Sequence, residues 1–199
     1  WPRKRLGEYT TKVGSGITPL GGQAVYLGSG VALIRSQNVH MNRFVHDGLT
    51  YISHEQDAKM EDSRVQPGDV LLNMTGASIG RVCVVPTELC PANVNQHVSI
   101  IRCTSDLLST FLSYYISTPD FQRFVMESQA GATRQALTKA VIQDFHVPLP
   151  PLSEQQRVAT TLNGQMATVE HLRKALQEEL ATISKVPAAL LRRAFSGGL

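Results

Sequence analysis

Val147-Pro148-Leu149-Pro150-Pro151-Leu152-Ser153-Glu154-Gln155-Gln156 contains the main boundary of this chain. Its prolines lack backbone N–H donors and push the residues before them out of helical geometry, so no regular element is expected to continue through them. Directly after them, Ser153 and Gln156 have the spacing of a capping box, which predicts the start of a helix. The sequence therefore predicts a first domain over residues 1–150 and a long helical segment over residues 151–199.

Apolar residues recur at every seventh position after this boundary. They are Leu162, Val169, Leu176, Ile183 and Leu190. A helix over residues 154–195 would be roughly 60 Å long and could not bury this stripe by itself. We expect a coiled coil with a second helix, from another copy of the chain or from a part of it that is missing here. A helix that bends at Gly164 or Pro187 and folds back on its own domain is the alternative.

Residues 1–150 combine short β-like runs with two helical stretches. The runs cover residues 31–35, 69–74, 81–85 and 97–103, with glycine and proline turns between them. Apolar spacing predicts a helix from Ser105-Asp106 to Thr118-Pro119, and the latter pair can cap a second helix whose Phe121, Phe124 and Val125 face inward. The predicted fold class is α+β, a mixed β-rich domain followed by a long coiled-coil-forming α-helix.

Composition limits the class of protein. With 199 residues and 42% hydrophobic content, the chain can form one well-buried domain plus an appendage. It has neither an apolar run of about 18 residues nor an apolar signal peptide, so we expect a soluble, cytoplasmic protein. Because the first residue is Trp1, we expect the sequence to begin inside a longer product. Three cysteines without Cys-x-x-Cys spacing favour reduced thiols over disulfides or zinc ligands.

The motifs of the common enzyme classes are missing from the sequence. The loop Gly76-Ala77-Ser78-Ile79-Gly80-Arg81 lacks the Gly-Lys-Ser/Thr ending of a phosphate-binding loop and is expected to be a tight loop between strands. The histidines lack His-Glu-x-x-His spacing, so no metal site is predicted. A metal-dependent nuclease built on Asp47, Asp57 and Lys59 stays open as an alternative, although this pattern is loose enough to arise by chance.

Polar side chains in turn-rich stretches are the candidate binding residues. Arginine suits guanine, glutamine and asparagine suit adenine, and serine or threonine suits phosphate. The net charge is only +3, so any affinity for nucleic acid needs a local patch or partner subunits. The candidates are Arg35, Gln37, Asn38, Arg81, Thr133, Arg134, Gln135 and Lys139.

Several segments together resemble a known family. They are Trp1-Pro2, Leu6-Gly7-Glu8, Gly16-Ile17-Thr18-Pro19, Pro67-Gly68-Asp69-Val70-Leu71-Leu72, Gly76-Ala77-Ser78-Ile79-Gly80-Arg81, Asn95-Gln96, the Gly131, Thr133, Gln135 and Leu137 set, the proline boundary, and Leu190-Leu191-Arg192-Arg193-Ala194-Phe195-Ser196-Gly197-Gly198-Leu199. On these motifs the chain is similar to the specificity (S) subunit of type I restriction-modification systems. The match extends over nearly the whole chain, and the proline boundary is its most specific part.

The resemblance implies a non-catalytic protein that recognises double-stranded DNA. In that family two recognition domains, separated by two antiparallel helices, each recognise half of a split target, and the helices fix the gap between the halves. Methyltransferase (M) subunits using S-adenosylmethionine, and an ATP- and Mg-dependent restriction (R) subunit, would supply the chemistry, with no cofactor on this chain. One domain and one helix imply a half-length subunit that forms a homodimer or half of a longer subunit. A protein-protein scaffold that binds no nucleic acid is the competing hypothesis.

Overall fold

The computed structural model describes residues 1–127 and 136–196. The chain forms two compact units, Trp1–Ala159 and Thr160–Leu199. The sequence predicts the boundary at residue 150, whereas the first unit extends nine residues further because Gln155 and Ala159 are buried within it.

Two four-stranded sheets form the centre of the first unit. One is antiparallel throughout, with the strand order β2 (Thr10–Ser15), β11 (Val98–Cys103), β8 (Val70–Asn73), β9 (Val82–Val84). The other has the order β6 (Thr50–Ile52), β3 (Val31–Ile34), β10 (Ala92–Val94), β7 (Arg64–Val65), and its β3–β10 pair is parallel. Two small sheets pair β1 (Arg3–Arg5) with β12 (His146–Pro148) and β4 (Val39–His40) with β5 (Arg43–Phe44).

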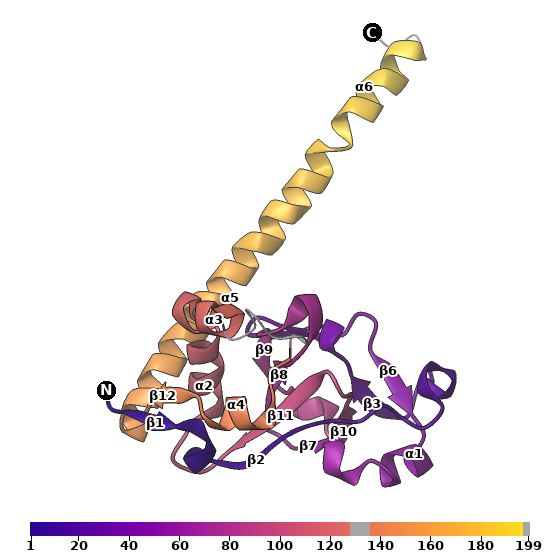
Figure 1. Cartoon of the computed structure of the whole chain (residues 1–199). Helices are drawn as coiled ribbons and strands as arrows, with labels where there is room; N and C mark the ends of the chain where they lie inside the picture. Colours follow the sequence, from indigo (N-terminus) through magenta and orange to yellow (C-terminus); the bar gives the residue numbers. More distant parts are fainter. Residues whose placement is uncertain (128–135, 197–199) are drawn as a thin grey trace. The chain divides into compact units, whose positions relative to one another are not determined.

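The helices complete the first unit and form the second. They are α1 (His54–Ala58), α2 (Ser109–Ile116), α3 (Pro119–Glu127), α4 (Lys139–Gln143), α5 (Leu152–Ile183) and α6 (Val186–Phe195). Within the first unit, α2 and α3 lie on one side of the β2–β11–β8–β9 sheet and the β3-containing sheet lies on the other (Figure 1). The α+β class and the terminal helical segment predicted from the sequence are confirmed.

Side-chain alternation along β8 explains the layered core. Val70 and Leu72 pack into the cluster that contains the α2 residues Phe111 and Leu112. Leu71 points the opposite way, into the cluster between the two sheets. Both faces of this strand are buried, which accounts for the continuous apolar run Val70-Leu71-Leu72 before Asn73. All four predicted strands are confirmed, as β3, β8, β9 and β11.

The helices differ from the predictions in four details, which concern where they begin, where they end and which side chains face inward. Helix α2 begins at Ser109, whereas the predicted start is Ser105-Asp106. In α3, Phe124 is predicted to face inward but is 47% exposed, although its ring contacts that of Phe145. The capping box is wrong, because α5 begins at Leu152 and the amides of Glu154 and Gln155 donate to the Pro151 carbonyl. Ser153 therefore lies inside the first turn. Helices α5 and α6 are separate because Pro187 has no N–H to continue the ladder.

Gln155 fixes the start of α5 within the first unit. Its side chain is fully buried, and its Oε1 accepts from the Leu108 amide at 2.8 Å, next to the start of α2. Its Nε2 donates to the carbonyls of Asp106 and Pro150, both at 2.9 Å. One carboxamide thus satisfies backbone groups on both sides of the proline boundary.

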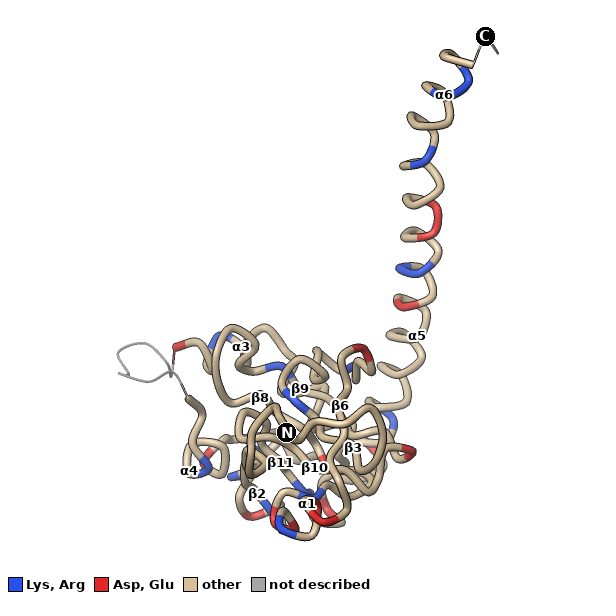
Figure 2. The backbone as a smooth tube through the Cα atoms, turned by 90° about the vertical axis from the view of Figure 1, so that its right-hand side faces the viewer, with Lys and Arg blue, Asp and Glu red and all other residues tan. Residues whose placement is uncertain are grey.

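The second unit exposes its apolar stripe. Val169, Leu176, Ile183 and Leu190 are all more than half exposed, and no apolar side chain is buried among residues 160–196. Charged residues of both signs alternate along these helices (Figure 2), as in the Glu170–Arg173 ion pair at 2.6 Å. Among the described residues, no helix is both long enough and apolar enough to cross a membrane.

Gly16 lies where a side chain has no room. A Cβ atom built there would lie 1.7 Å from the Val94 carbonyl oxygen, which belongs to the backbone of β10 and cannot move freely. We predict that Gly16→Ala lowers the free energy of unfolding by about 3 kcal/mol or prevents folding. Gly14→Ala, where a Cβ meets nothing within 4 Å, is the matched control and should change stability by less than about 1 kcal/mol. Equal denaturation midpoints for the two variants would contradict this packing.

Candidate nucleic-acid interface

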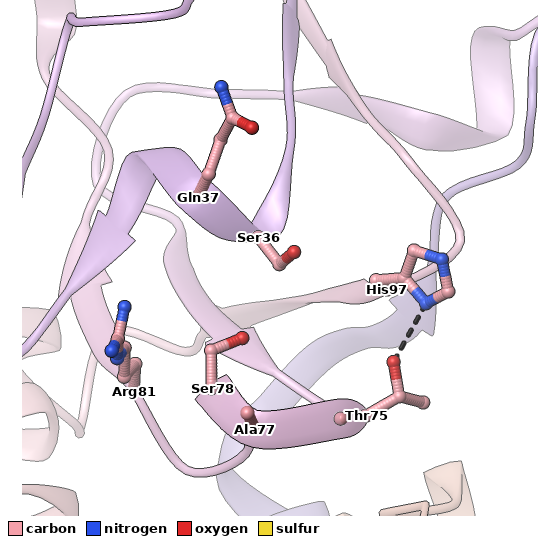
Figure 3. A pocket seen from close by; sticks show the side chains of 8 residues that line it. Ser36, Gln37, Thr75, Ala77, Ser78, Arg81 and His97 are labelled. Atoms are coloured by element: carbon pink, nitrogen blue, oxygen red, sulfur yellow. Dashed lines mark hydrogen bonds between the residues drawn. The ribbon is translucent and has the colours of Figure 1, made fainter.

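A polar hollow lies where two turns and one histidine meet. Its volume is about 440 Å³. The turns follow β3 and β8, and the histidine precedes β11 (Figure 3). The lining residues are Ser36, Gln37, Thr75, Gly76, Ala77, Ser78, Arg81 and His97.

Asn38 holds the first turn together. Its side chain is fully buried, its Oδ1 accepts from the Arg35 amide at 3.0 Å, and its Nδ2 donates to the carbonyls of Val45 and Asp47. The buried carboxamide therefore closes residues 35–48 around the short β4–β5 pairing. The prediction that Asn38 contacts a ligand is corrected, because its polar atoms are used within the protein.

Arg35 and Gln37 share one acceptor in this turn. The Gly48 carbonyl accepts from Arg35 Nη2 at 2.6 Å and from Gln37 Nε2 at 3.0 Å. The Arg35 guanidinium also lies 5.4 Å from the centre of the Tyr26 ring. Gln37 is exposed and lines the hollow, and Arg35 lies beside it, half-buried. Gln37 thus keeps its amide oxygen available as an acceptor.

The second turn joins β8 to β9. Gly76 and Gly80 have φ values of +72° and +83°, which glycine adopts without strain. The Gly80 amide donates to the Asn73 carbonyl at 2.9 Å, and the Asn73 amide donates to the Arg81 carbonyl at 2.8 Å, so the loop is closed at its base. The prediction of a tight inter-strand loop is confirmed. Arg81 leaves this loop as the one charged arginine or lysine among the lining residues.

His97 is a lining residue that sequence reasoning missed. Its Nδ1 lies 2.7 Å from Thr75 Oγ1, as the dashed line in Figure 3 shows, and its Nε2 lies 3.0 Å from Gln96 Nε2. Asn95 positions it, because Asn95 Oδ1 accepts from the His97 amide at 3.2 Å. In the sequence, the pair Asn95-Gln96 directly before a β-rich run indicates this turn. The pair does not identify His97 as a binding residue.

Of the remaining predicted site residues, the structure describes Lys139 alone, and it does not line the hollow. Lys139, at the start of α4, lines a separate hollow with Lys12, Thr10 and Thr11. Thr133, Arg134 and Gln135 lie outside the described residues. The structure thus brings Gln37 and Arg81 together, with Arg35 adjacent.

The carboxylate at Asp57 is already paired. Arg64 Nε and Nη2 donate to its two oxygens at 2.9 and 2.6 Å, and Asn93 Nδ2 also donates to it. The Arg64 hydrogen bonds hold the pKa of Asp57 below its ordinary value. Lys59 is paired with Glu55 at 2.7 Å. This geometry gives no support to a nuclease built on Asp47, Asp57 and Lys59, since Asp57 serves the fold.

These observations define the class of protein. The first unit is an α+β binding module, with hydrogen-bonding side chains on turns over a packed core, and an amphipathic helix follows it. The chain belongs to the family of type I restriction modification DNA specificity domains, whose family model matches residues 30–181.

Individual relatives agree with this membership. The chain is 27% identical over 173 residues to the specificity subunit of the type I restriction enzyme EcoBI of Escherichia coli, a match covering 85% of this chain and 36% of that subunit. A solved chain of a type I restriction-modification system superposes with a TM-score of 0.73 at 25% identity, covering 100% of this chain and 46% of that one. The HsdS subunit of Thermoanaerobacter tengcongensis shares the fold, with a TM-score of 0.64 at 24% identity, covering 100% of this chain and 46% of that subunit. The chain therefore spans less than half the length of these relatives.

The Asp57–Arg64 pair predicts a pH-dependent contribution to stability. Because the folded-state pKa of Asp57 is lowered, this contribution is present above its ordinary pKa of about 4 and is lost as the pH falls through the folded value. We predict that Asp57→Asn lowers the free energy of unfolding by about 1–3 kcal/mol at neutral pH, and that the deficit shrinks in acid. Denaturant titrations at several pH values measure it, with the exposed Asp47→Asn as control. A deficit that is independent of pH would contradict the assignment.

Proposed function

We propose that this chain recognises double-stranded DNA as the specificity component of a type I restriction-modification system, binding one half of a bipartite target in the cytoplasm. The observation that carries the proposal is the hollow lined by Gln37, Arg81 and His97, in a member of a DNA specificity family. These side chains offer the donors and acceptors that base edges and phosphates require. The chain itself would be non-catalytic.

Partner subunits would supply the chemistry under this proposal. Methyltransferase subunits, with S-adenosylmethionine, would modify the DNA, and a restriction subunit, with ATP and Mg²⁺, would cleave it. The net charge of +3 supports this division, because it leaves the chain without a broad basic surface and makes partner contacts with DNA useful. Residues Thr133, Arg134, Gln135 and Lys139 remain further candidates for DNA contacts.

Selection from a library of random duplexes tests the proposal. The chain, assembled with the methyltransferase subunits of its own system, should enrich one defined half-site sequence. A protein-protein scaffold would bind its partners and enrich no sequence, and that result would overturn the proposal.

Substitutions in the hollow should act on that enriched duplex. We predict that Arg81→Ala weakens binding about tenfold, because it removes a charge-assisted contact with a base or phosphate. Gln37→Ala should relax the preference at one base position and leave the salt dependence unchanged. Lys59→Ala removes a charge outside the hollow and is the control. Fluorescence anisotropy at several salt concentrations measures both effects, and unchanged affinity and specificity in Arg81→Ala and Gln37→Ala would reject the hollow as the DNA site.

The exposed stripe of the second unit supports a further part of the proposal, a homodimer through the long helix. Burying Leu162, Val169, Leu176, Ile183 and Leu190 against a second helix would remove their apolar surface from water. We predict that Leu176→Glu and Ile183→Glu abolish association in light scattering. Gln177→Glu introduces the same charge beside the stripe and should leave the dimer intact. A wild-type chain that is monomeric at all concentrations would contradict homodimerisation.

A further inference from the structure

Asn73 lies beneath the hollow and joins its two turns. It is the last residue of β8 and is fully buried. By alternation its side chain points to the same face as Leu71, toward the β3-containing sheet. It therefore sits between the turn that follows β3 and the turn that follows β8.

Its carboxamide nitrogen contacts both turns. Nδ2 donates to the Ser36 carbonyl at 2.8 Å and lies 3.4 Å from the Val39 carbonyl, and these residues flank Gln37. The same nitrogen lies 3.1 Å from Ser78 Oγ, in the turn that leads to Arg81. One side chain thus connects the segments that carry Gln37 and Arg81, which come from different sheets and are 44 positions apart (81 − 37 = 44).

The chemistry of this contact requires an amide. Two backbone carbonyls face Nδ2, and carbonyls accept hydrogen bonds only, so the NH₂ group has to point at them. Aspartate would bring a carboxylate oxygen against these acceptors, and leucine would leave them without a donor. Asn73 Oδ1, moreover, is buried and makes no hydrogen bond in the described part of the chain. Keeping a polar group that is only partly satisfied disfavours folding, which suggests a role other than core stability.

We propose that Asn73 is a positioning residue that sets the separation of the two base-contacting turns, and so determines how sharply the hollow discriminates between DNA sequences. This inference rests on the proposed function. Base readout needs donor–acceptor distances within a few tenths of an ångström, whereas phosphate attraction tolerates displacement. Loss of the Asn73 bonds therefore reduces discrimination more than it reduces general affinity.

Asn93 provides a matched control within the same chain. It is also a fully buried asparagine at the centre of a strand pairing, in β10. Its side chain bonds to Asp57 and Ser63, and neither residue lines the hollow. Asn73→Ala and Asn93→Ala both remove a buried carboxamide, but only the first separates the two turns.

The experiment measures a discrimination ratio, the affinity for the enriched duplex divided by the affinity for its single-base variants. The chain is assembled with its methyltransferase subunits, and the temperature is kept below the unfolding midpoint of every variant. Asn73→Ala should lower the discrimination ratio about tenfold and change affinity for random duplex less than about twofold. Asn93→Ala should lose thermal stability and keep the wild-type ratio. Equal ratios in the wild type and Asn73→Ala, or equal losses in the two alanine variants, overturn the inference.

A second set of variants covers a failure of Asn73→Ala to fold. Ser78→Ala removes the bond at the outer end of the network together with a hydroxyl that lines the hollow, and Asn73→Ser keeps one hydroxyl donor. Both should lower the ratio by less than Asn73→Ala, and the effects of Ser78→Ala and Asn73→Ser should not add in a double variant, because they act through one contact. Full additivity overturns the inference. If the wild-type chain enriches no sequence, the proposed function is rejected instead. The selection experiment gives that result before any variant is made.

Discussion

The backbone N–H and C=O groups of a turn do not form a regular sheet ladder and need other hydrogen-bond partners. In this chain, buried side-chain amides supply those partners. Asn38 closes the turn after β3, Asn73 joins it to the turn after β8, and Asn95 supports the His97 amide. Gln155 performs the same task at the start of α2 and α5. A buried amide costs free energy unless its bonds are made, so each of them selects one arrangement of the backbone around it. The geometry of the hollow depends on this constraint.

The sequence predicts those features that depend on local pattern. Apolar, β-branched runs identify β3, β8, β9 and β11, and the adjacent prolines identify the boundary before α5. The buried amides could not be identified, because an asparagine in a polar turn looks the same whether it faces solvent, as predicted for Asn38, or the protein interior, as observed. The short strands β6, β7 and β10 were missed because they form through long-range pairing. Resemblance to a family is the basis of the proposed function, which spacing and composition alone left open.

The two units meet different physical demands. The first has two cores on either side of one sheet, which give its turns a rigid base. The second has no buried apolar residue among residues 160–196, and packing against another helix would bury its apolar stripe. Under the proposed function, this separation lets the turns vary with the target sequence while the helix keeps its repeat. Pro187 interrupts the helical hydrogen-bond ladder between α5 and α6, whereas the seven-residue repeat continues from Ile183 to Leu190.

The most direct test of the account is photo-crosslinking from the floor of the hollow. A benzophenone side chain is placed at Ala77, which is exposed and lines the hollow, and at Ala24, which is exposed outside it. With the assembled complex bound to its enriched duplex, DNA contact at the hollow predicts crosslinks from position 77 to bases of the half-site and none from position 24. Crosslinks that arise only outside the hollow, with the duplex fully bound, would contradict it.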